Sequence, residues 1–559
     1  MFKRIISLCL VTVMLAALVA CGNIGDQVDE TYTDSETYTD SETYGVGELY
    51  TFPVDDLSKF KIVYEQGISL NVLKKVRTLQ AYFKDEFEIN LASSSDKSEE
   101  VDCEILIGNT NRIATFGSKN MAPRTNDCYI GASDTNIVVT AYTEERIIEA
   151  IDTLIAHMND MKDSGSFFDV HFRYTDRKEY TTPEITVGKV GLEHYSIFCE
   201  DSAVGKKMAG KVSDIIRESF NYSLRITTVA DSDRMIVVGN TELGVPLKSA
   251  SYGTDKYYIG VDESKIYLYG SELKAGVNAI ERFASIVEDM KKSGVCDMEE
   301  VSDLGVVEFE DTSIKSMTFN LYYQIGDDQR VANVIDTIKR HSPDTLGVQE
   351  ATGVWMNKLK SELGDEYGCV GVGRKNNGSS SDEFCAVFYK KSRFEVIESG
   401  TKWLSETPDV EGSQMSGAKY PRIFTYALLR DKLTGESYLC MNTHTDHVGD
   451  GGTVRYKQVQ VIVDFIRKNY KDVPIILTGD LNDQSTSSSI QYLLSTEFDN
   501  SSELAYEEDI SPTFSSGVID YLLLTKDDFI VYSYDVDTEL YNNEFASDHR
   551  AVVIEYIVK

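Results

Sequence analysis

Residues 475–482 read Ile-Ile-Leu-Thr-Gly-Asp-Leu-Asn, an apolar run that ends on a carboxylate and an amide. Apolar runs of four to eight residues bounded by turn-forming residues are typical of buried strands. A solvated loop needs no such composition. The stretch therefore predicts a buried strand whose end carries Asp480 and Asn482 to the edge of a sheet.

Seven further segments repeat this placement of polar side chains at the ends of apolar strands. They are Met317–Asn320, Thr345–Glu350, Asp382–Phe384, Tyr420–Arg422, Asn442–His444, Val518–Tyr521 and Ala546–His549. Any one of these segments alone would more often be a turn than a site. Eight of them within one region indicate that their polar side chains meet in a shared site.

In this order the motifs closely resemble those of the endonuclease/exonuclease/phosphatase superfamily, over about residues 313–559. The resemblance implies an α/β fold, with a C-terminal four-layer α/β sandwich of two mixed β-sheets at residues 310–559. It also implies a metal-dependent phosphoesterase centre where the strand ends converge. One departure lies at 416–420, Ser-Gly-Ala-Lys-Tyr, where a bacterial subgroup of the superfamily tends to have Gly-Trp-Asp-Ala before its Pro-Arg.

The same resemblance implies a divalent cation. Glu350 and Asn320 are expected to lie beside Mg²⁺ or Mn²⁺, and Asp548 is expected to face it. Carboxylate and amide oxygens are ligands that these hard cations prefer. Cleaving a phosphate ester requires neutralisation of charge on the phosphoryl oxygens, which such a cation supplies.

His549 resembles the general base or transition-state stabiliser of the superfamily. An imidazole needs an acceptor on its other nitrogen to fix the tautomer, and Asp520 is expected to provide it. Asp480 and Asn482 would hold the attacking water and a phosphate oxygen.

The sequence 442–450, Asn-Thr-His-Thr-Asp-His-Val-Gly-Asp, carries two of the seven histidines in the chain. His444 resembles the second histidine of the superfamily, which donates to a phosphate oxygen, and Glu383 is its expected orienting carboxylate. Asp446 and His447 either shape the substrate pocket or are turn residues at a strand end.

Two further expectations concern arginines near the same motifs. Arg422 either binds phosphate or forms a surface salt bridge. Arg455 and Gln458 lie at i and i+3 on the helix expected after this loop, where they are expected to brace it.

The first residues are typical of an export signal. Lys3 and Arg4 precede an apolar stretch, and residues 18–22 read Leu-Val-Ala-Cys-Gly. This is similar to a bacterial lipoprotein signal at 1–21, which implies cleavage before Cys21 and lipid on its sulfur. We therefore expect an extracytoplasmic protein anchored to the cell membrane by Cys21.

Residues 22–50 are expected to be a disordered acidic linker, because the repeat at 29–44, Asp-Glu-Thr-Tyr-Thr-Asp-Ser-Glu, contains no aliphatic residue. Of the nine cysteines, Cys9 and Cys21 belong to the signal. The other seven are scattered without the Cys-x-x-Cys spacing of a zinc site or a disulfide framework, so buried free thiols are expected.

A longer repeat divides the next part of the chain. Residues 104–110, Glu-Ile-Leu-Ile-Gly-Asn-Thr, match 235–241, Met-Ile-Val-Val-Gly-Asn-Thr, and each copy continues into further matching strands and an amphipathic helix. Two small α/β modules are expected at 51–180 and 181–305, each beginning with a helix ahead of its first strand. They resemble the small α/β domain that precedes the catalytic barrel of hexosaminidase-like glycoside hydrolases, which implies glycan contact.

Charge limits the classes of function. The net charge is −36, and residues 311–559 hold 24 Lys and Arg against 39 Asp and Glu. This region lacks the basic footprint of a nucleic-acid binder. The first expectation is a surface-anchored phosphoesterase acting on phosphate mono- or diesters, with a small phosphorylated molecule or lipid headgroup favoured. The alternatives are a glycan-binding lipoprotein with a non-catalytic phosphoesterase-like domain, and an extracellular nuclease.

Overall fold

The computed structural model describes residues 51–559, with gaps at 67, 111, 113–123, 134, 177–179, 181, 183, 231, 244–253, 263, 302–304 and 449–451. The predicted signal, Cys21 and the acidic linker lie outside the described residues. None of the helices in the described part of the chain combines the length and apolarity needed to span a bilayer.

The first part of the described chain forms a six-stranded mixed sheet in the order β3-β2-β4-β6-β5-β8. Its strands are β2 (Lys61–Tyr64), β3 (Ser93–Ser95), β4 (Glu104–Ile107), β5 (Cys128–Ser133), β6 (Asn136–Ala141) and β8 (Arg173–Asp176). Helices α2 (Leu70–Phe87) and α4 (Glu144–Met161) pack their apolar faces onto the sheet and bury Ala150 and Ile151. Two short strands, β1 (Thr51–Pro53) and β7 (Ser166–Asp169), form a separate antiparallel pair.

The second part repeats this topology in a six-stranded sheet of order β12-β11-β13-β15-β14-β16. Its strands are β11 (Ser196–Cys199), β12 (Arg225–Thr227), β13 (Met235–Val238), β14 (Lys256–Asp262), β15 (Lys265–Gly270) and β16 (Gly305–Glu308). Helices α5 (Ala203–Phe220) and α6 (Leu273–Ser293) cover it as α2 and α4 cover the first sheet. The matching turns after β4 and β13 both place glycine at positive φ, +83° at Gly108 and +78° at Gly239.

Two details of the expected modules are wrong. A strand, β2 or β11, precedes the helix of each copy. These two strands lie outside the matching segments from which the modules were predicted. The second sheet also extends past residue 305, since β16 ends at Glu308 and pairs with β14.

The last part of the chain contains two larger sheets. One has the order β19-β20-β18-β17-β29-β28-β26, and the other β21-β22-β23-β24-β27-β25. The strands of the first are β17 (Ile314–Asn320), β18 (Thr345–Thr352), β19 (Tyr367–Val370), β20 (Glu383–Lys390), β26 (Glu507–Glu508), β28 (Phe529–Val536) and β29 (Val552–Val558). Those of the second are β21 (Phe394–Trp403), β22 (Ile423–Asp431), β23 (Ser437–His444), β24 (Ile475–Asp480), β25 (Phe498–Asn500) and β27 (Asp520–Thr525).

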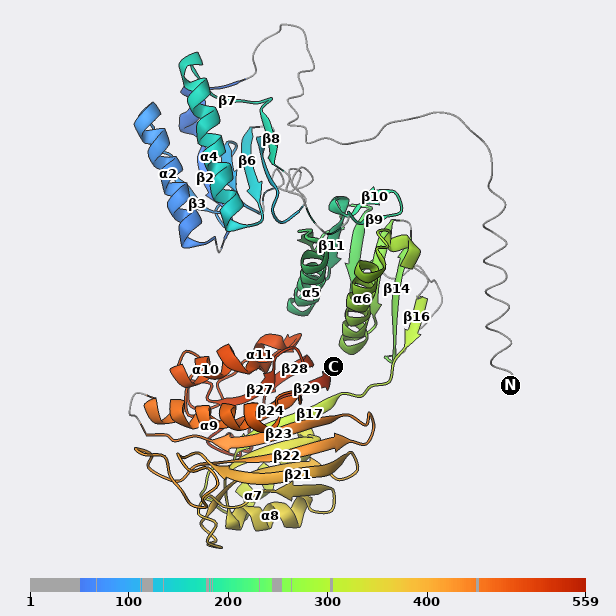
Figure 1. The fold of residues 1–559 in the computed structure, drawn as a ribbon, viewed down its shortest axis with the longest axis vertical. Coiled ribbons are helices and arrows are strands. Elements are labelled where there is room, and N and C mark those ends of the chain that lie inside the picture. Colours follow the sequence, from blue (N-terminus) through green and yellow to red (C-terminus); the bar gives the residue numbers. More distant parts are fainter. Residues whose placement is uncertain are drawn as a thin grey trace, which may run out of the picture. The chain divides into compact units, whose positions relative to one another are not determined.

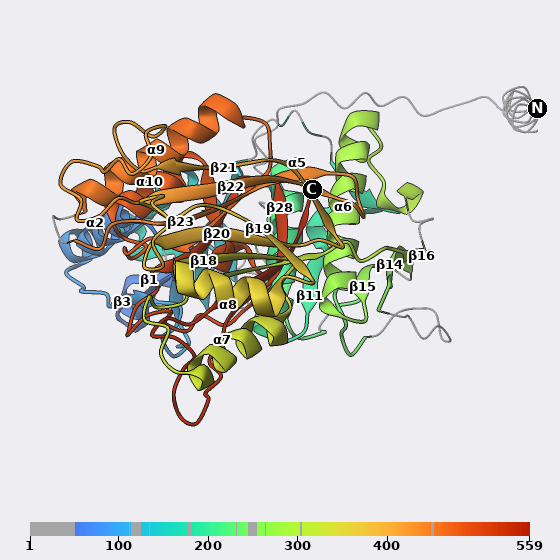
Figure 2. The same ribbon diagram turned by 90° about the horizontal axis from the view of Figure 1, so that it is seen from below.

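Helices cover the outer faces of this pair of sheets (Figures 1 and 2). They are α7 (Asp328–His341) and α8 (Gly353–Leu363) on one side, with α9 (Thr453–Asn469) and α10 (Ser488–Thr496) on the other; α11 (Ser501–Leu504) is a single turn. Three apolar cores fill the spaces between the four layers. Both sheets mix parallel and antiparallel pairs, such as β17 with β18 and β17 with β29. The expected four-layer α/β sandwich is confirmed.

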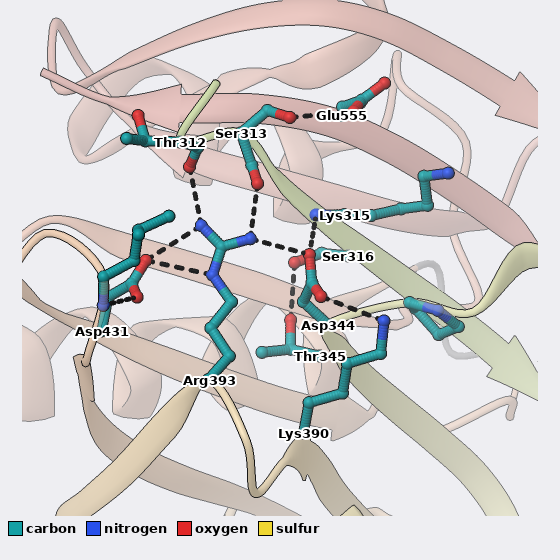
Figure 3. Close-up of polar contacts among 12 residues, drawn as sticks. Thr312, Ser313, Lys315, Ser316, Asp344, Thr345, Lys390, Arg393, Asp431 and Glu555 are labelled. Carbon is teal, nitrogen blue, oxygen red and sulfur yellow. Dashed lines mark hydrogen bonds and ion pairs between the residues drawn. The ribbon is translucent and has the colours of Figure 1, made fainter. Parts of the chain in front are cut away.

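An arginine fastens the two sheets together at the end of the domain where the chain enters. The Arg393 guanidinium donates to Asp431 at 2.9 Å and Asp344 at 3.1 Å, and to the carbonyl oxygens of Thr312 and Ser313 (Figure 3). Asp344 precedes β18 in one sheet, and Asp431 ends β22 in the other. The Arg393 side chain is 15% exposed and that of Asp431 is 2% exposed, so the pair is held mostly out of water.

Arg393→Met is expected to lower the free energy of unfolding of this domain by about 3–5 kcal/mol, because it leaves the buried Asp431 carboxylate unpaired. Chemical denaturation followed by tryptophan fluorescence measures this, since both tryptophans of the chain, Trp355 and Trp403, lie in this domain. The matched control is Arg430→Met, whose side chain is 52% exposed, with an expected change within about 0.5 kcal/mol. Equal stability of the two variants would contradict the assigned role of Arg393.

Candidate active site

Three neighbouring strand ends bring polar side chains together between the two sheets. Asn320 ends β17, Asp480 ends β24, and Asp520 begins β27, directly opposite Asp480 in the antiparallel register. Asn320 Nδ2 donates to Asp480 Oδ2 at 2.9 Å. All three side chains are buried, so the predicted convergence of these motifs holds at the level of atoms.

Glycine and small residues let the backbones approach closely beneath this point. A Cβ at Gly479 would lie 2.4 Å from the carbonyl oxygen of Thr443, and one at Gly347 would lie 2.2 Å from Thr478 Oγ1. Glycine in a strand is expected where another chain segment comes this close. Gly479 therefore allows the close packing of the strands, and the next residue, Asp480, places its carboxylate in the site.

His549 faces two carboxylates. Its Nδ1 lies 2.9 Å from Asp520 Oδ2, and its Nε2 lies 3.8 Å from Asp480 Oδ2. The Phe514 ring stacks on the imidazole with centroids 4.5 Å apart. Burial alone would lower the pKa of His549, but the nearby Asp520 and Asp480 carboxylates outweigh it and raise the pKa to about 9. Burial, then Asp520, raises the pKa of Asp480.

His444 ends β23 on the other side of Asp480. Its Nε2 lies 3.4 Å from Asp480 Oδ2. Burial lowers the pKa of His444 well below its ordinary value, and Arg422, the next largest cause, acts in the same direction. The ring is therefore neutral at physiological pH.

The expected pairing of Glu383 with His444 is wrong. Glu383 Oε1 instead accepts from Arg374 Nη2 at 2.6 Å, and the carboxylate beside His444 is Asp480. Burial raises the pKa of Glu383, while Arg374 opposes the shift. A charged guanidinium is a stronger partner for a partly buried carboxylate than a neutral imidazole is, which explains the difference.

Glu350 occupies a break in the pairing of β18 with β20, where the register shifts between Val348 and Ala351. Its φ is +52°, a conformation that is uncommon for residues other than glycine and clusters at functional sites. Bulges of this kind re-aim a side chain. Glu350 Oε2 accepts from the backbone N–H of Tyr323 at 2.9 Å.

The side chains of Glu350 and Asn320 both accept hydrogen bonds from the short backbone segment that follows β17. Asn320 Oδ1 accepts from the N–H of Tyr322 at 3.0 Å, one residue before the Tyr323 N–H that binds Glu350. Ser547 Oγ donates to Asn320 O at 2.8 Å and lies 3.2 Å from Asp548 Oδ1. The Asp548 residue is exposed, unlike most of the site.

These residues fit a hard divalent cation. Glu350, Asn320 and Asp548 offer carboxylate and amide oxygens, the donor set that suits Mg²⁺ or Mn²⁺. Within the described residues a second set, Asp480, Asp520 and His549, has one potential ligand atom of each within 4.8 Å of the others. Asp520 is already committed to the Nδ1 of His549, so we assign that second set to proton and phosphate chemistry.

Asn482 sits just beyond the end of β24 with φ +49°. Its N–H donates to Asp480 Oδ1 at 2.9 Å, and its Nδ2 donates to the carbonyl oxygen of Thr445 at 3.2 Å. The Asp-Leu-Asn turn thus fixes Asp480 and holds the amide of Asn482 beside the loop that follows His444.

The loop after His444 is braced as the sequence predicts. Gln458 Oε1 accepts from the Asp446 N–H at 2.8 Å, and Arg455 Nη1 donates to the carbonyl oxygens of Asp446 and Val448 at 3.3 and 3.1 Å. Asp446 is itself buried and accepts from the N–H groups of Lys419 and Val448. The turn role left open for Asp446 is therefore the one observed.

Arg422 is not a surface residue. It is 4% exposed, and its Nη2 lies 3.0 Å from His447 Nδ1. Together with Arg374 it lines a cavity that Glu350, Glu383 and His444 also border. The surface salt bridge considered for Arg422 is excluded, whereas its place beside the site agrees with phosphate binding.

A buried amide pair under the site had no predicted role. Gln349 Nε2 donates to Asn442 Oδ1 at 2.6 Å, and Asn442 Nδ2 donates to the carbonyl oxygens of Val348 and Ala386 at 2.9 Å each. The pair joins β18 of one sheet to β23 of the other. Its members sit next to Glu350 and two residues before His444, so it sets the relative position of the two halves of the site.

Residues 317–549 match the endonuclease/exonuclease/phosphatase family. The C-terminal domain is a member of this family. The description of the family names enzymes that hydrolyse phosphoester bonds, and the match covers every proposed site residue of the domain.

Relatives of the endonuclease/exonuclease/phosphatase domain include two curated proteins. Carbon catabolite repressor protein 4 homolog 3 of Arabidopsis thaliana is 25% identical over 187 residues, which cover 32% of this chain and 39% of that protein. Protein angel of Drosophila melanogaster is 25% identical over 171 residues, 30% of this chain and 46% of that protein. The matches thus span less than half the length of either relative.

Two of the solved structures similar to the domain come from Bacteroides. An endonuclease/exonuclease/phosphatase of Bacteroides vulgatus is 28% identical, covers 44% of this chain and 100% of that chain, and has a TM-score of 0.42. A mannosyl-6-phosphatase of Bacteroides thetaiotaomicron is 27% identical, covers 44% of this chain and 99% of that chain, and has a TM-score of 0.39.

Proposed function

We propose that the C-terminal domain is a divalent-metal-dependent phosphoesterase. The observation that carries the proposal is the arrangement of His549 between two carboxylates, with Asp520 on Nδ1 and Asp480 beside Nε2. A binding scaffold has no need of such an arrangement, since a buried cluster of two carboxylates and an imidazole is costly unless it does chemistry.

His549 acts through its Nε2. Because the pKa of His549 is raised to about 9, the ring is protonated at neutral pH and Nε2 carries a proton. This favours transition-state stabilisation, by donation to a phosphoryl oxygen, over the general-base role that the sequence left open. Asp520 holds the ring in place through Nδ1.

Asp480 and Asn482 position the attacking water and one phosphate oxygen. Burial and Asp520 raise the pKa of Asp480, which makes its carboxylate a better proton acceptor than an ordinary aspartate. His444 is neutral and lies on the opposite side of Asp480, where it can donate to a second phosphate oxygen.

Glu350, Asn320 and Asp548 would hold Mg²⁺ or Mn²⁺. A bound divalent cation would neutralise charge on the phosphoryl group and help the leaving oxygen. Arg422 adds a positive charge from the wall of the cavity.

The favoured substrate is a small phosphorylated molecule or a lipid headgroup. A net charge of −36 opposes a long polyanion, so extracellular nucleic acid ranks behind these two. The alternative is a glycan-binding lipoprotein whose terminal domain is inactive. The intact set of Asn320, Glu350, Asp480 and His549 argues against that alternative.

A substrate panel tests this proposal. The purified mature protein with Mg²⁺ or Mn²⁺ should release phosphate from a sugar phosphate or from phospholipid vesicles faster than it cleaves single-stranded or duplex DNA. Faster cleavage of DNA would favour the nuclease. Binding of oligosaccharides without hydrolysis of any phosphoester would favour the glycan-binding lipoprotein.

We also propose that the protein is anchored to the outer face of the bacterial cell membrane by lipid on Cys21. The support is the Leu-Val-Ala-Cys sequence at 18–21. Cys21→Ala is expected to move the protein from the membrane fraction to the soluble fraction, as measured by fractionation and immunoblotting. Cys9→Ala, within the same signal, should leave it in the membrane; retention of the Cys21 variant at the wild-type level would refute the anchor.

A further inference from the structure

Arg374 and Arg422 are buried side chains of one cavity beside the proposed cation site. Arg374 lies between β19 and β20, and Arg422 immediately precedes β22. The two residues are 8% and 4% exposed. Arginine is seldom buried to this degree unless an anion compensates it.

Arg374 has an ion-pair partner, whereas Arg422 has none within 4 Å in the described part of the chain; Glu383 and Asp446 act on Arg422 only from farther away. Arg374 pairs with Glu383 at 2.6 Å. The contact of Arg422 is with His447 Nδ1 at 3.0 Å, and since a guanidinium can only donate, that nitrogen is a neutral acceptor. With Glu350 assigned to the cation, Glu383 is the one carboxylate among the described cavity residues that pairs with either arginine.

Donors of both guanidinium groups are still unfilled. The Nε atoms of Arg374 and Arg422 are buried and make no hydrogen bond in the described structure. Burial lowers the pKa of Arg422 and the nearby charge of Arg374 lowers it further, while Glu383 and Asp446 oppose the shift. A buried pair of cations with spare donors is a site for an anion that carries more than one charge.

Aromatic and apolar side chains pack around the two arginines. The Arg374 guanidinium lies over the Tyr420 ring, 4.6 Å from its centroid. Cys385 and Ile423, which are 5% and 1% exposed, close the cavity with apolar surface. The cavity has a volume of about 10 Å³, room for about one water-sized group. It can therefore take a single phosphate oxygen, whereas a second ester substituent would meet buried side chains.

We propose that Arg374 and Arg422 bind the terminal oxygens of a phosphate monoester, so that the domain is a phosphomonoesterase. This inference rests on the proposed phosphoesterase function. A phosphomonoester carries a charge of about −1.5 to −2 at neutral pH and presents three terminal oxygens, whereas a diester carries a single charge and presents two. Two planar guanidinium groups match the first better than the second.

Two chromogenic esters with the same leaving group test the inference. Wild-type protein with Mn²⁺ is expected to hydrolyse 4-nitrophenyl phosphate with a higher kcat/KM than bis(4-nitrophenyl) phosphate. Arg374→Lys and Arg422→Lys keep the positive charge but lose the planar guanidinium group with its several N–H donors. Each should lower kcat/KM for the monoester about 10- to 100-fold, as for a lost charge-assisted hydrogen bond. The diester rate should change less than about threefold.

The matched control is Arg430→Lys, near the far end of β22, the strand that Arg422 immediately precedes. It should alter neither rate. Preference of the wild type for the diester, or equal losses on both esters in the two cavity variants, would overturn the inference and leave the phosphoesterase proposal standing. Hydrolysis of neither ester would instead count against the phosphoesterase proposal.

Phosphate binding provides a readout that does not depend on turnover. Inorganic phosphate should raise the Tm of the metal-loaded wild type and of Arg430→Lys, and should raise it much less in Arg374→Lys and Arg422→Lys. An equal rise in all four proteins would overturn the inference even if none of them hydrolysed an ester. The Tm without phosphate shows whether each variant is folded.

Discussion

The His549→Ala variant is expected to hydrolyse its phosphoester about 10² to 10⁴ times more slowly than the wild type, while its fold is retained. The magnitude is that of losing a positioned proton donor or acceptor. The reason is the position of the ring, with Nδ1 2.9 Å from Asp520 and Nε2 facing Asp480. Steady-state kinetics with saturating Mg²⁺ or Mn²⁺ measure the loss, and Tm shows that the protein is folded.

His194→Ala is the matched control, because the side chain of His194 is 44% exposed and lies outside the C-terminal domain. Its kcat should equal that of the wild type.

The pH profile of the wild-type rate tests the role of His549 in a second way. The raised pKa of His549, about 9, means that the ring loses its proton as the pH rises through that value, so a donor role predicts a fall in rate above about pH 9. Activity that instead rises through this range would support the general-base role.

The Glu350→Ala variant is expected to lose both cation binding and turnover. Glu350 is the carboxylate that the break in β18 turns toward the Asn320 segment, and its Oε2 is held there by the Tyr323 N–H. Removing a carboxylate ligand from a hard-cation site lowers affinity, and the phosphoryl charge is then left without its counter-ion. Calorimetric titration with Mn²⁺ measures the binding directly, and kinetics measure the rate.

The control is Glu406→Ala, an exposed carboxylate whose Oε1 accepts from the Ser416 N–H at 3.2 Å. It thereby contacts the segment 416–420, where the sequence departs from the superfamily pattern. This variant should bind Mn²⁺ as the wild type does and should mainly change substrate preference. Undiminished Mn²⁺ affinity of Glu350→Ala would remove Glu350 from the cation site, whatever the effect on rate.

Local patterns in the sequence predict the convergence of the site because its residues sit at strand ends. Asn320, Asp480 and Asp520 each follow or precede an apolar run. Asp480 and Asp520 meet because β24 and β27 pair in one sheet, and Asn320 reaches Asp480 from the facing sheet. The fold of the domain was predictable for the same reason: each strand carries its own pattern, and the order of the motifs resembles that of a known superfamily.

Pairings between distant charged residues were not predictable. Glu383 was expected to orient His444, but it binds Arg374 at 2.6 Å, since several cations and carboxylates meet in one cavity and only their geometry decides which of them pair. The contacts of Arg393 with Asp344 and Asp431 depend in the same way on how two sheets are packed, which no local pattern records.

The repeat within residues 51–305 gave one prediction that was confirmed and one element that was missed. The matching segments around Gly108 and Gly239 correctly indicated equal topology, because both turns require positive φ. The strands β2 and β11 were missed because they lie outside the matching segments and next to long amphipathic helices with a much stronger pattern. Glycan contact by these two sheets remains a prediction.

The most direct measurement of the central claim is metal-dependent release of phosphate by the purified mature protein, compared with His549→Ala under the same conditions. We predict no turnover after chelation, full turnover when Mg²⁺ or Mn²⁺ is restored, and a rate for the variant that stays about 10² to 10⁴ times lower at every metal concentration. Hydrolysis that persists in the chelated wild type, or that is undiminished in His549→Ala, would contradict the account.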